Sequence, residues 1–214
     1  RVHPLPREGG RGEGSPLTAV ILAGGLGRRV EGADKGLLLF RGKPLVQWVL
    51  DRIEPQVQET LLNANRNREV YASFGVRVIG DQIADHPGPL AGLHAGLVEA
   101  ENEWVLSLPC DAPFLPLNLA QRLGAVRGKP GVRAAIACCQ GRQHPVFALC
   151  HRDQADRLEA YLREGGRRVG AWFTLIEAVE VPFDDQPEAF QNLNTQSAID
   201  ACGSGSVETI GRAR

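Results

Sequence analysis

The sequence predicts an α/β fold, a three-layer sandwich around a mostly parallel, Rossmann-like sheet. Short apolar runs typical of buried strands alternate with longer segments that carry apolar residues at helical spacing. Polar residues also follow almost every predicted strand, and in such sheets ligands bind beyond the carboxyl ends of the strands. We therefore expect the functional site at that edge of the sheet.

The predicted strands are short apolar runs that end in polar or turn-forming residues. The first run stops abruptly at Gly24-Gly25. In chain order, we expect strands at residues 19–23, 59–62, 76–79, 104–108, 132–139, 146–150 and 178–181.

The predicted helices lie between these strands. The segment 45–53 has helical apolar spacing that includes Val49 and Ile53, and Pro44 is acceptable in its first turn. The segment 90–100 is rich in small residues, which indicates close packing. In chain order, we expect helices at 45–53, 90–100, 117–126, 155–163, 169–173 and 196–202.

The length of 214 residues suits one large domain, which we expect at 17–202. The segment 1–16 is rich in glycine and proline and is interpreted as a disordered tail, and 203–214 as a flexible C-terminal tail. The net charge of -1 argues against broad attraction to nucleic acids or membranes. No apolar run approaches the roughly 20 residues of a membrane-spanning helix.

The five cysteines form no C-x-x-C pair, so neither a disulfide framework nor a zinc site is expected. Cys138 and Cys139 are neighbours on a predicted strand and should face opposite sides of the sheet. We interpret the cysteines as buried thiols of a cytoplasmic protein. The chain is expected to be a monomer.

The loop after the first strand has the composition of a phosphate-binding loop. Gly24 and Gly25 let the backbone approach a ligand and expose its N–H groups, and Arg28, Arg29 and Lys35 follow within a few residues. These cations favour an anion such as a nucleoside triphosphate. A glycine-rich turn with solvated charges is the alternative.

Two common glycine motifs do not match this loop. A P-loop needs a hydroxyl residue after its lysine, but Gly36 follows Lys35. A dinucleotide fingerprint needs a third glycine, and Val30 occupies that position.

Asp111 follows the predicted strand 104–108 and is a candidate Mg²⁺ ligand, because Mg²⁺ takes carboxylate oxygens and shares substrate phosphates. Arg29 and Lys35 would neutralise the β- and γ-phosphates and stabilise a leaving pyrophosphate. The three residues are therefore the expected catalytic group. A carboxylate that only caps a turn is the alternative for Asp111.

Asp81 follows the third predicted strand and could accept hydrogen bonds from N1–H and N2–H₂ of guanine, which adenine lacks at those positions. Asn63 follows the second strand and offers both a donor and an acceptor to the base or ribose. A turn residue at a strand end is the alternative for Asp81. Asn65 and Asn67 are interpreted as turn formers.

No Ser/His/Asp or Cys/His nucleophile system is evident in the sequence. An attacking phosphate oxygen, already ionised at pH 7, would not need a strong general base. Candidates for contacts with a second substrate are His144, Arg167, Arg168, Asn192 and Asn194.

Several short motifs in this order resemble the molybdenum cofactor guanylyltransferase family, and they span about residues 18–200. The matching segments are Leu22-Ala23-Gly24-Gly25, Arg28-Arg29, Asp34-Lys35-Gly36, Gly42-Lys43-Pro44-Leu45, Asn63-Ala64-Asn65-Arg66, Pro87-Gly88-Pro89-Leu90-Ala91-Gly92, Pro109-Cys110-Asp111-Ala112-Pro113, His144-Pro145 and Asn192-Leu193-Asn194-Thr195. The glycine loop is shared by many nucleotidyltransferases, whereas the ordered set is more specific.

The resemblance implies transfer of GMP from GTP to molybdopterin that carries molybdenum, with Mg²⁺ as cofactor. It also implies transient contacts with molybdopterin-delivering proteins and apo-molybdoenzymes. Transfer of CMP or of a nucleotide to a sugar phosphate, and a non-catalytic carrier, are the alternatives. By resemblance the nucleotide is held by Leu22, Ala23, Gly24, Lys35, Asn63, Asp81 and Asp111.

Overall fold

A computed structural model describes residues 16–24, 34–83 and 88–193. Its central sheet has seven strands in the order β5-β4-β1-β6-β8-β7-β9. β8 is antiparallel to both of its neighbours, and the other strands share one direction. The strands are β1 (Leu17–Leu22), β4 (Glu59–Asn63), β5 (Arg77–Ile79), β6 (Trp104–Pro109), β7 (Ala134–Cys139), β8 (Arg142–His151) and β9 (Val179–Pro182).

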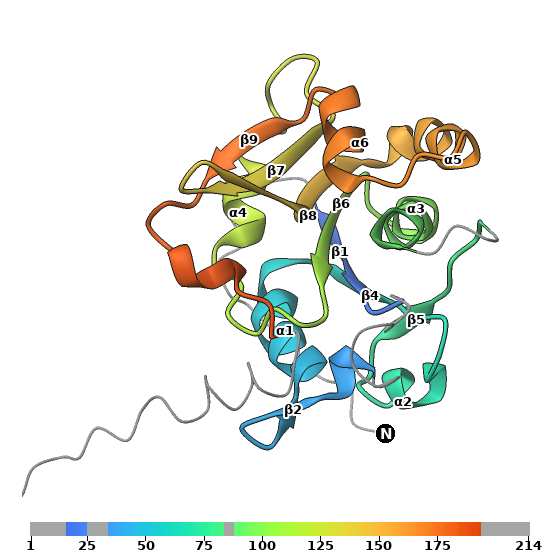
Figure 1. The fold of residues 1–214 in the computed structure, drawn as a ribbon, viewed down its shortest axis with the longest axis vertical. Helices are drawn as coiled ribbons and strands as arrows, with labels where there is room; N and C mark the ends of the chain where they lie inside the picture. Colours follow the sequence, from blue (N-terminus) through green and yellow to red (C-terminus); the bar gives the residue numbers. More distant parts are fainter. Residues whose placement is uncertain (1–15, 25–33, 84–87, 194–214) are drawn as a thin grey trace, which may run out of the picture.

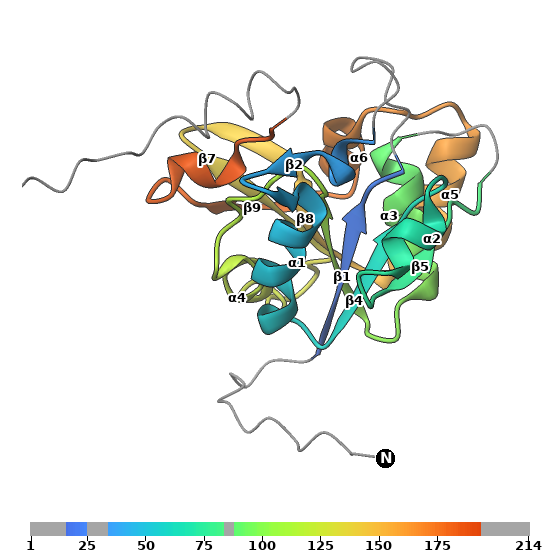
Figure 2. The same ribbon diagram turned by 90° about the horizontal axis from the view of Figure 1, so that it is seen from below.

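Helices cover both faces of the sheet, which confirms the predicted α/β sandwich (Figures 1 and 2). On one face, α1 (Leu45–Ile53) and α4 (Leu119–Gly124) share a core with β1 and β6. On the other, α3 (Pro89–Glu99), α5 (Ala155–Arg163) and α6 (Val169–Leu175) form a second core. Burial on both sides explains why β1 and β6 are continuous apolar runs.

The register of the parallel strands brings their ends together. Leu22, the last residue of β1, pairs with Asn63 of β4 on one side and with Pro109 of β6 on the other. Asn63 in turn pairs with Ile79, the last residue of β5. The loops after these four strands therefore start at one level of the sheet, at its carboxyl edge.

Shorter elements connect the main strands and helices, and several of them lie at that edge. The hairpin of β2 (Leu39–Phe40) and β3 (Lys43–Pro44) turns through Arg41 and Gly42, whose φ angles are 51° and 75°. The hairpin packs against the chain near Leu193. The remaining short helices are η1 (Lys35–Leu37), α2 (Arg68–Ala72), η2 (Glu54–Gln56), η3 (Arg152–Gln154) and η4 (Pro187–Phe190).

The predicted helices at 45–53 and 155–163 match α1 and α5. β8 starts at Arg142 and not at residue 146, because its polar first residues pair with β7 across the turn at Gln140-Gly141. α2 was not predicted; its five residues are too few to show a helical period. The predicted helix at 196–202 and both predicted tails lie outside the described residues, except the exposed Pro16.

Within the described residues, Cys110, Cys138, Cys139 and Cys150 are free thiols. Cys139 is buried in the core beneath α4, whereas Cys138 on the opposite face is only partly covered, as the strand alternation predicts. None of the described helices is both long enough and apolar enough to cross a membrane.

Candidate active site

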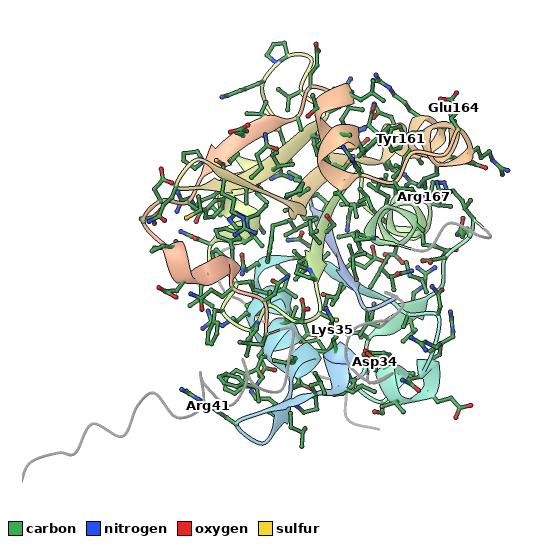
Figure 3. All side chains as sticks on the ribbon, in the orientation of Figure 1. Asp34, Lys35, Arg41, Tyr161, Glu164 and Arg167 are labelled. Atoms are coloured by element: carbon green, nitrogen blue, oxygen red, sulfur yellow. The ribbon has the colours of Figure 1, made fainter. Side chains whose placement is uncertain are left out.

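Two of the three residues that the sequence predicts as catalytic lie next to each other at the carboxyl edge. Lys35 Nζ lies 3.6 Å from Asp111 Oδ2, although the two residues are far apart in sequence. The Asp111 side chain is 7% exposed, whereas that of Lys35 is 35% exposed. Burial raises the pKa of Asp111, and the neighbouring ammonium of Lys35 lowers it in part. A desolvated carboxylate and a more accessible cation thus lie close together. Figure 3 labels Lys35 beside Asp34.

Backbone hydrogen bonds fix the loop after β6. Cys110 N donates to the Leu22 carbonyl at 3.3 Å, and Leu193 N donates to the Asp111 carbonyl at 2.9 Å. Asp111 is therefore held between the end of β1 and the segment after η4. Asn192 precedes Leu193 and is exposed.

Lys35 lies on a single turn of 3₁₀ helix that Asp34 caps. Asp34 Oδ1 accepts a hydrogen bond from Gly36 N at 3.3 Å and another from the Tyr71 hydroxyl. Its Oδ2 accepts from Asn67 Nδ2 at 3.0 Å. Sequence reasoning assigned no role to Asp34 or Tyr71, and it treated Asn67 only as a turn former. Asn67 does have a left-handed φ of 52°, but its side chain also contacts Asp34.

Asp81 and Asn63 are brought together, as predicted, on the other side of the glycine turn. Asn63 Nδ2 donates to Asp81 Oδ1 at 2.9 Å. Asn65 Nδ2 donates to Asp81 Oδ2 at 2.7 Å, and Asn65 Oδ1 accepts from Asp81 N at 2.9 Å. Asn65 is therefore more than a turn former, because it holds the Asp81 carboxylate from a second direction.

Two glycines leave room for Asn63. A Cβ on Gly24 would lie 2.8 Å from Asn63 Oδ1, and a Cβ on Gly92 would lie 2.5 Å from the same atom. Gly92 is in the first turns of α3, so the glycine turn after β1 and the start of α3 both press on this amide. Only residues without a side chain allow so close an approach.

His144 lies at the same edge but further along the sheet. β8 runs antiparallel to β6, and Ser107 pairs with Ala148. Because the two strands run in opposite directions, residues before Ala148 lie level with residues after Ser107. His144 and Asp111 are equally far from this pair, so both lie at the carboxyl edge. The imidazole stacks on Phe190 of η4 at 4.5 Å between ring centroids. Burial and the nearby Arg142 lower the pKa of His144, which keeps its ring neutral at pH 7.

Arg167 and Arg168 are not brought to the Lys35–Asp111 pair. Arg167 Nη1 donates to the Leu162 carbonyl at 3.0 Å, at the end of α5. Figure 3 shows Arg167 beside α5, on the opposite face of the sheet from Lys35. Gly25, Arg28, Arg29 and Asn194 are predicted site residues that lie outside the described part of the chain.

Comparisons with known proteins show which family the chain belongs to. The family profile of the MobA-like NTP transferase domain matches residues 19–178. The chain is 45% identical over 194 residues to a molybdenum cofactor guanylyltransferase from Ralstonia nicotianae, covering 86% of this chain and 95% of that protein. A molybdenum cofactor guanylyltransferase from Yersinia pseudotuberculosis is 46% identical over 184 residues, with coverage of 86% and 93%.

Among solved structures, the molybdopterin-guanine dinucleotide biosynthesis protein A from Archaeoglobus fulgidus aligns with a TM-score of 0.73 at 26% identity, covering 87% of this chain and 96% of that one. The chain is therefore a nucleotidyltransferase and belongs to the family of molybdenum cofactor guanylyltransferases with a MobA-like NTP transferase domain.

Proposed function

We propose that the protein transfers GMP from GTP to the terminal phosphate of molybdenum-loaded molybdopterin and releases pyrophosphate. The observation that carries the proposal is the Lys35–Asp111 pair at the carboxyl edge, with the Asn63–Asp81 pair close by. The first pair suits the phosphates of a nucleotide and the second suits its base. The relatives from Ralstonia nicotianae and Yersinia pseudotuberculosis carry the name of this activity.

The proposed reaction is an in-line displacement at the α-phosphorus of GTP. An oxygen of the pterin phosphate forms the new bond to phosphorus while the bond to the β-phosphate oxygen breaks, and its electron pair leaves with pyrophosphate. The attacking phosphate is ionised at neutral pH, so no residue has to remove a proton. The chain then contributes position and charge: Lys35, together with the predicted Arg29, would stabilise the charge that grows on pyrophosphate.

The residues present fit Mg²⁺ as the divalent ion. A buried carboxylate is costly unless cations offset its charge, and the raised pKa of Asp111 shows that Lys35 offsets it only in part. Mg²⁺ is commonly held by one or two carboxylates together with substrate phosphates. Asp111 would hold the ion, which when bound neutralises phosphate charge. In the described part of the chain, no three His, Cys, Asp or Glu side chains gather into an all-protein metal site.

Guanine selection is assigned to Asp81. An ionised carboxylate only accepts hydrogen bonds, and each of its oxygens has more than one lone pair. The amides of Asn63 and Asn65 each occupy one oxygen, which leaves acceptor capacity on both. Guanine presents two adjacent donors, whereas adenine and cytosine each present a single amino group beside a ring acceptor.

We place the second substrate on the other side of Asp111, along His144 and Asn192 and the predicted Asn194. A neutral imidazole stacked on Phe190 offers a flat surface and hydrogen-bonding nitrogens to a pterin. Arg167 and Arg168 were predicted for the same substrate, and the geometry of the described chain adds no support for them.

The proposal also includes a monomeric, cytoplasmic enzyme that meets molybdopterin-delivering proteins and apo-molybdoenzymes transiently. A pyrophosphate-release assay with each of the four nucleoside triphosphates, with and without loaded molybdopterin, tests the activity. We expect release with GTP, only when the pterin and Mg²⁺ are present.

Each alternative gives a different result in that assay. A preference for CTP would replace the guanylyl assignment with a cytidylyl one. Release that requires a sugar phosphate would replace the acceptor. Tight GTP binding without any release would indicate a carrier.

A further inference from the structure

The Lys35 ammonium depends on a very short structural element. η1 contains only three residues, and a helix of that length has no stability of its own. The amide groups at its N-terminus have no partner within the turn and must be held by other groups, as Asp34 holds Gly36 N. The catalytic geometry of Lys35 is therefore set by what holds Asp34, its capping residue.

Three donors surround the Asp34 carboxylate: Gly36 N, the Tyr71 hydroxyl and Asn67 Nδ2. Tyr71 is fully buried in the core, so its hydroxyl has a fixed position. Burial, with nearby Cys110 and Asp34, raises the pKa of Tyr71, so the hydroxyl stays a protonated donor at any physiological pH. The occupied carboxylate is also restrained from turning to the neighbouring Lys35.

The contact is tight on every side. A Cβ on Gly36 would lie 2.6 Å from the Tyr71 hydroxyl and 3.3 Å from the Cβ and Sγ of Cys110. Cys110 directly precedes Asp111 in the loop after β6. Tyr71 thus lies where the lysine turn and the loop that carries Asp111 meet.

α2, which carries Tyr71, is anchored on the base side of the site. Arg68 Nη1 donates to the Ala64 carbonyl at 3.3 Å, and its Nη2 donates to the Val78 carbonyl at 3.1 Å. Ala64 lies between Asn63 and Asn65, and Val78 is in β5 just before Asp81. α2 therefore spans from the proposed base contacts to the lysine turn.

We propose that Tyr71 is a positioning residue for Lys35: its hydroxyl holds Asp34, and Asp34 holds the turn that presents the ammonium to Asp111 and to the nucleotide phosphates. This inference rests on the phosphate role proposed for Lys35. It assigns no contact between Tyr71 and substrate. The effect of Tyr71 should therefore pass entirely through Lys35.

A double-mutant cycle with Tyr71→Phe and Lys35→Ala in the full chain tests this. Tyr71→Phe keeps the buried ring and removes only the hydroxyl. We expect the single variant to lower kcat about 10- to 100-fold, the range seen when a catalytic group moves by about 1 Å. GTP binding by calorimetry should also weaken. In the Lys35→Ala background, Tyr71→Phe should change either quantity less than about twofold, because coupled residues are non-additive.

Two controls separate positioning from general damage. Ser73→Ala removes a hydroxyl at the C-terminal cap of the same helix. That hydroxyl donates to the Val70 carbonyl and not to Asp34, so the variant should behave as wild type. The preference of Tyr71→Phe for GTP over ATP should be unchanged, since Asn63 and Asp81 remain in place; a loosened α2 would reduce it. If Tyr71→Phe does not fold, Asp34→Asn replaces it in the same cycle. The fall in kcat and in GTP affinity that Asp34→Asn causes should then be absent in the Lys35→Ala background.

The outcomes distinguish this inference from the proposed function. Additive losses, or a fully active Tyr71→Phe, overturn the positioning role while leaving guanylyl transfer intact. A wild-type protein that binds GTP but transfers nothing overturns the proposed function. The double-mutant cycle measured in GTP binding affinity then still tests the role of Tyr71. A Lys35→Ala variant with wild-type binding and kcat overturns the phosphate role of Lys35 and the positioning role of Tyr71 with it, while guanylyl transfer itself stands.

Discussion

Replacing Asn65 by alanine should weaken guanine selection, because Asn65 holds the Asp81 carboxylate in place. Asn65 makes two hydrogen bonds with Asp81, at 2.7 Å to the carboxylate and at 2.9 Å from the backbone N–H. A hydrogen bond to a charged group contributes about 1.5–3 kcal/mol and a neutral one about 0.5–1.5 kcal/mol. Asn65 is exposed, so water replaces part of what is lost.

We therefore expect a net loss of about 1.4 kcal/mol, which corresponds to about a tenfold fall in kcat/KM for GTP. The loss for ATP should be smaller, so that the GTP/ATP ratio falls. Asn65→Asp should be more damaging, because it sets a second carboxylate against Asp81. The assay is pyrophosphate release with each nucleotide, and Gln82→Ala is the control: Gln82 is next to Asp81 in sequence but donates to Glu99.

The reasoning would be refuted by an Asn65→Ala variant whose kcat/KM for GTP stays within about twofold of wild type at an unchanged GTP/ATP ratio. In that case the amide of Asn63 alone would be sufficient to orient Asp81. An equal loss of kcat/KM for GTP in Gln82→Ala would indicate general damage to the loop and would refute the specific role of Asn65.

Three further predictions concern the metal, the glycines and pH. Asp111→Ala should lower kcat about 10²–10³-fold. Stability should change little, because the substitution removes a desolvated charge. Excess chelator should abolish wild-type activity, and activity that survives both the substitution and the chelator would contradict the metal role. Gly92→Ala should weaken GTP binding and lower the free energy of unfolding by about 1–3 kcal/mol through overpacking, a loss that the higher helix propensity of alanine offsets in part. Gly170→Ala in α6 places its Cβ in open space and should leave stability unchanged or raise it, as measured by denaturant titration. Burial lowers the pKa of His94, although Glu159, 3.9 Å from Nε2, opposes this; the ring is 3% exposed, and neither nitrogen has a hydrogen bond among the described residues. The unfolded chain therefore binds more protons, and stability should fall as pH drops below about 6.5. In thermal unfolding, His94→Leu should reduce the fall in stability between pH 7 and pH 5. An unchanged pH dependence would mean that other groups cause it.

The sequence was sufficient for the architecture because the strands that build the site are buried on both faces. β1 and β6 appear as mostly apolar runs, each with a single hydroxyl residue (Thr18 and Ser107), and the polar residues that follow them could be assigned to the carboxyl edge. Lys35 and Asp111 were predicted as partners on this reasoning, and the structure brings them together. The antiparallel β8 was harder to delimit, since its first residues are polar and only pairing with β7 makes them a strand.

The residues that support the site could not be predicted, because their roles depend on contacts between distant segments. Asn65 has the composition of a turn former, and its two bonds to Asp81 arise only when β4 and β5 pair. Tyr71 lies in a five-residue helix without a visible period, and nothing in its neighbours shows that it reaches Asp34. Arg167 was predicted to contact substrate, and its hydrogen bond to the Leu162 carbonyl at the end of α5 is another contact that the sequence pattern does not show.

The most direct test of the account is the product itself. Purified protein, GTP, Mg²⁺ and molybdenum-loaded molybdopterin are incubated, and the products are analysed by mass spectrometry alongside the Lys35→Ala variant. We expect a pterin product heavier by one guanylyl group (GMP less one water), formed in equal amount with pyrophosphate and strongly reduced in the variant. An unmodified pterin, or a product that carries CMP when CTP is also supplied, would contradict it.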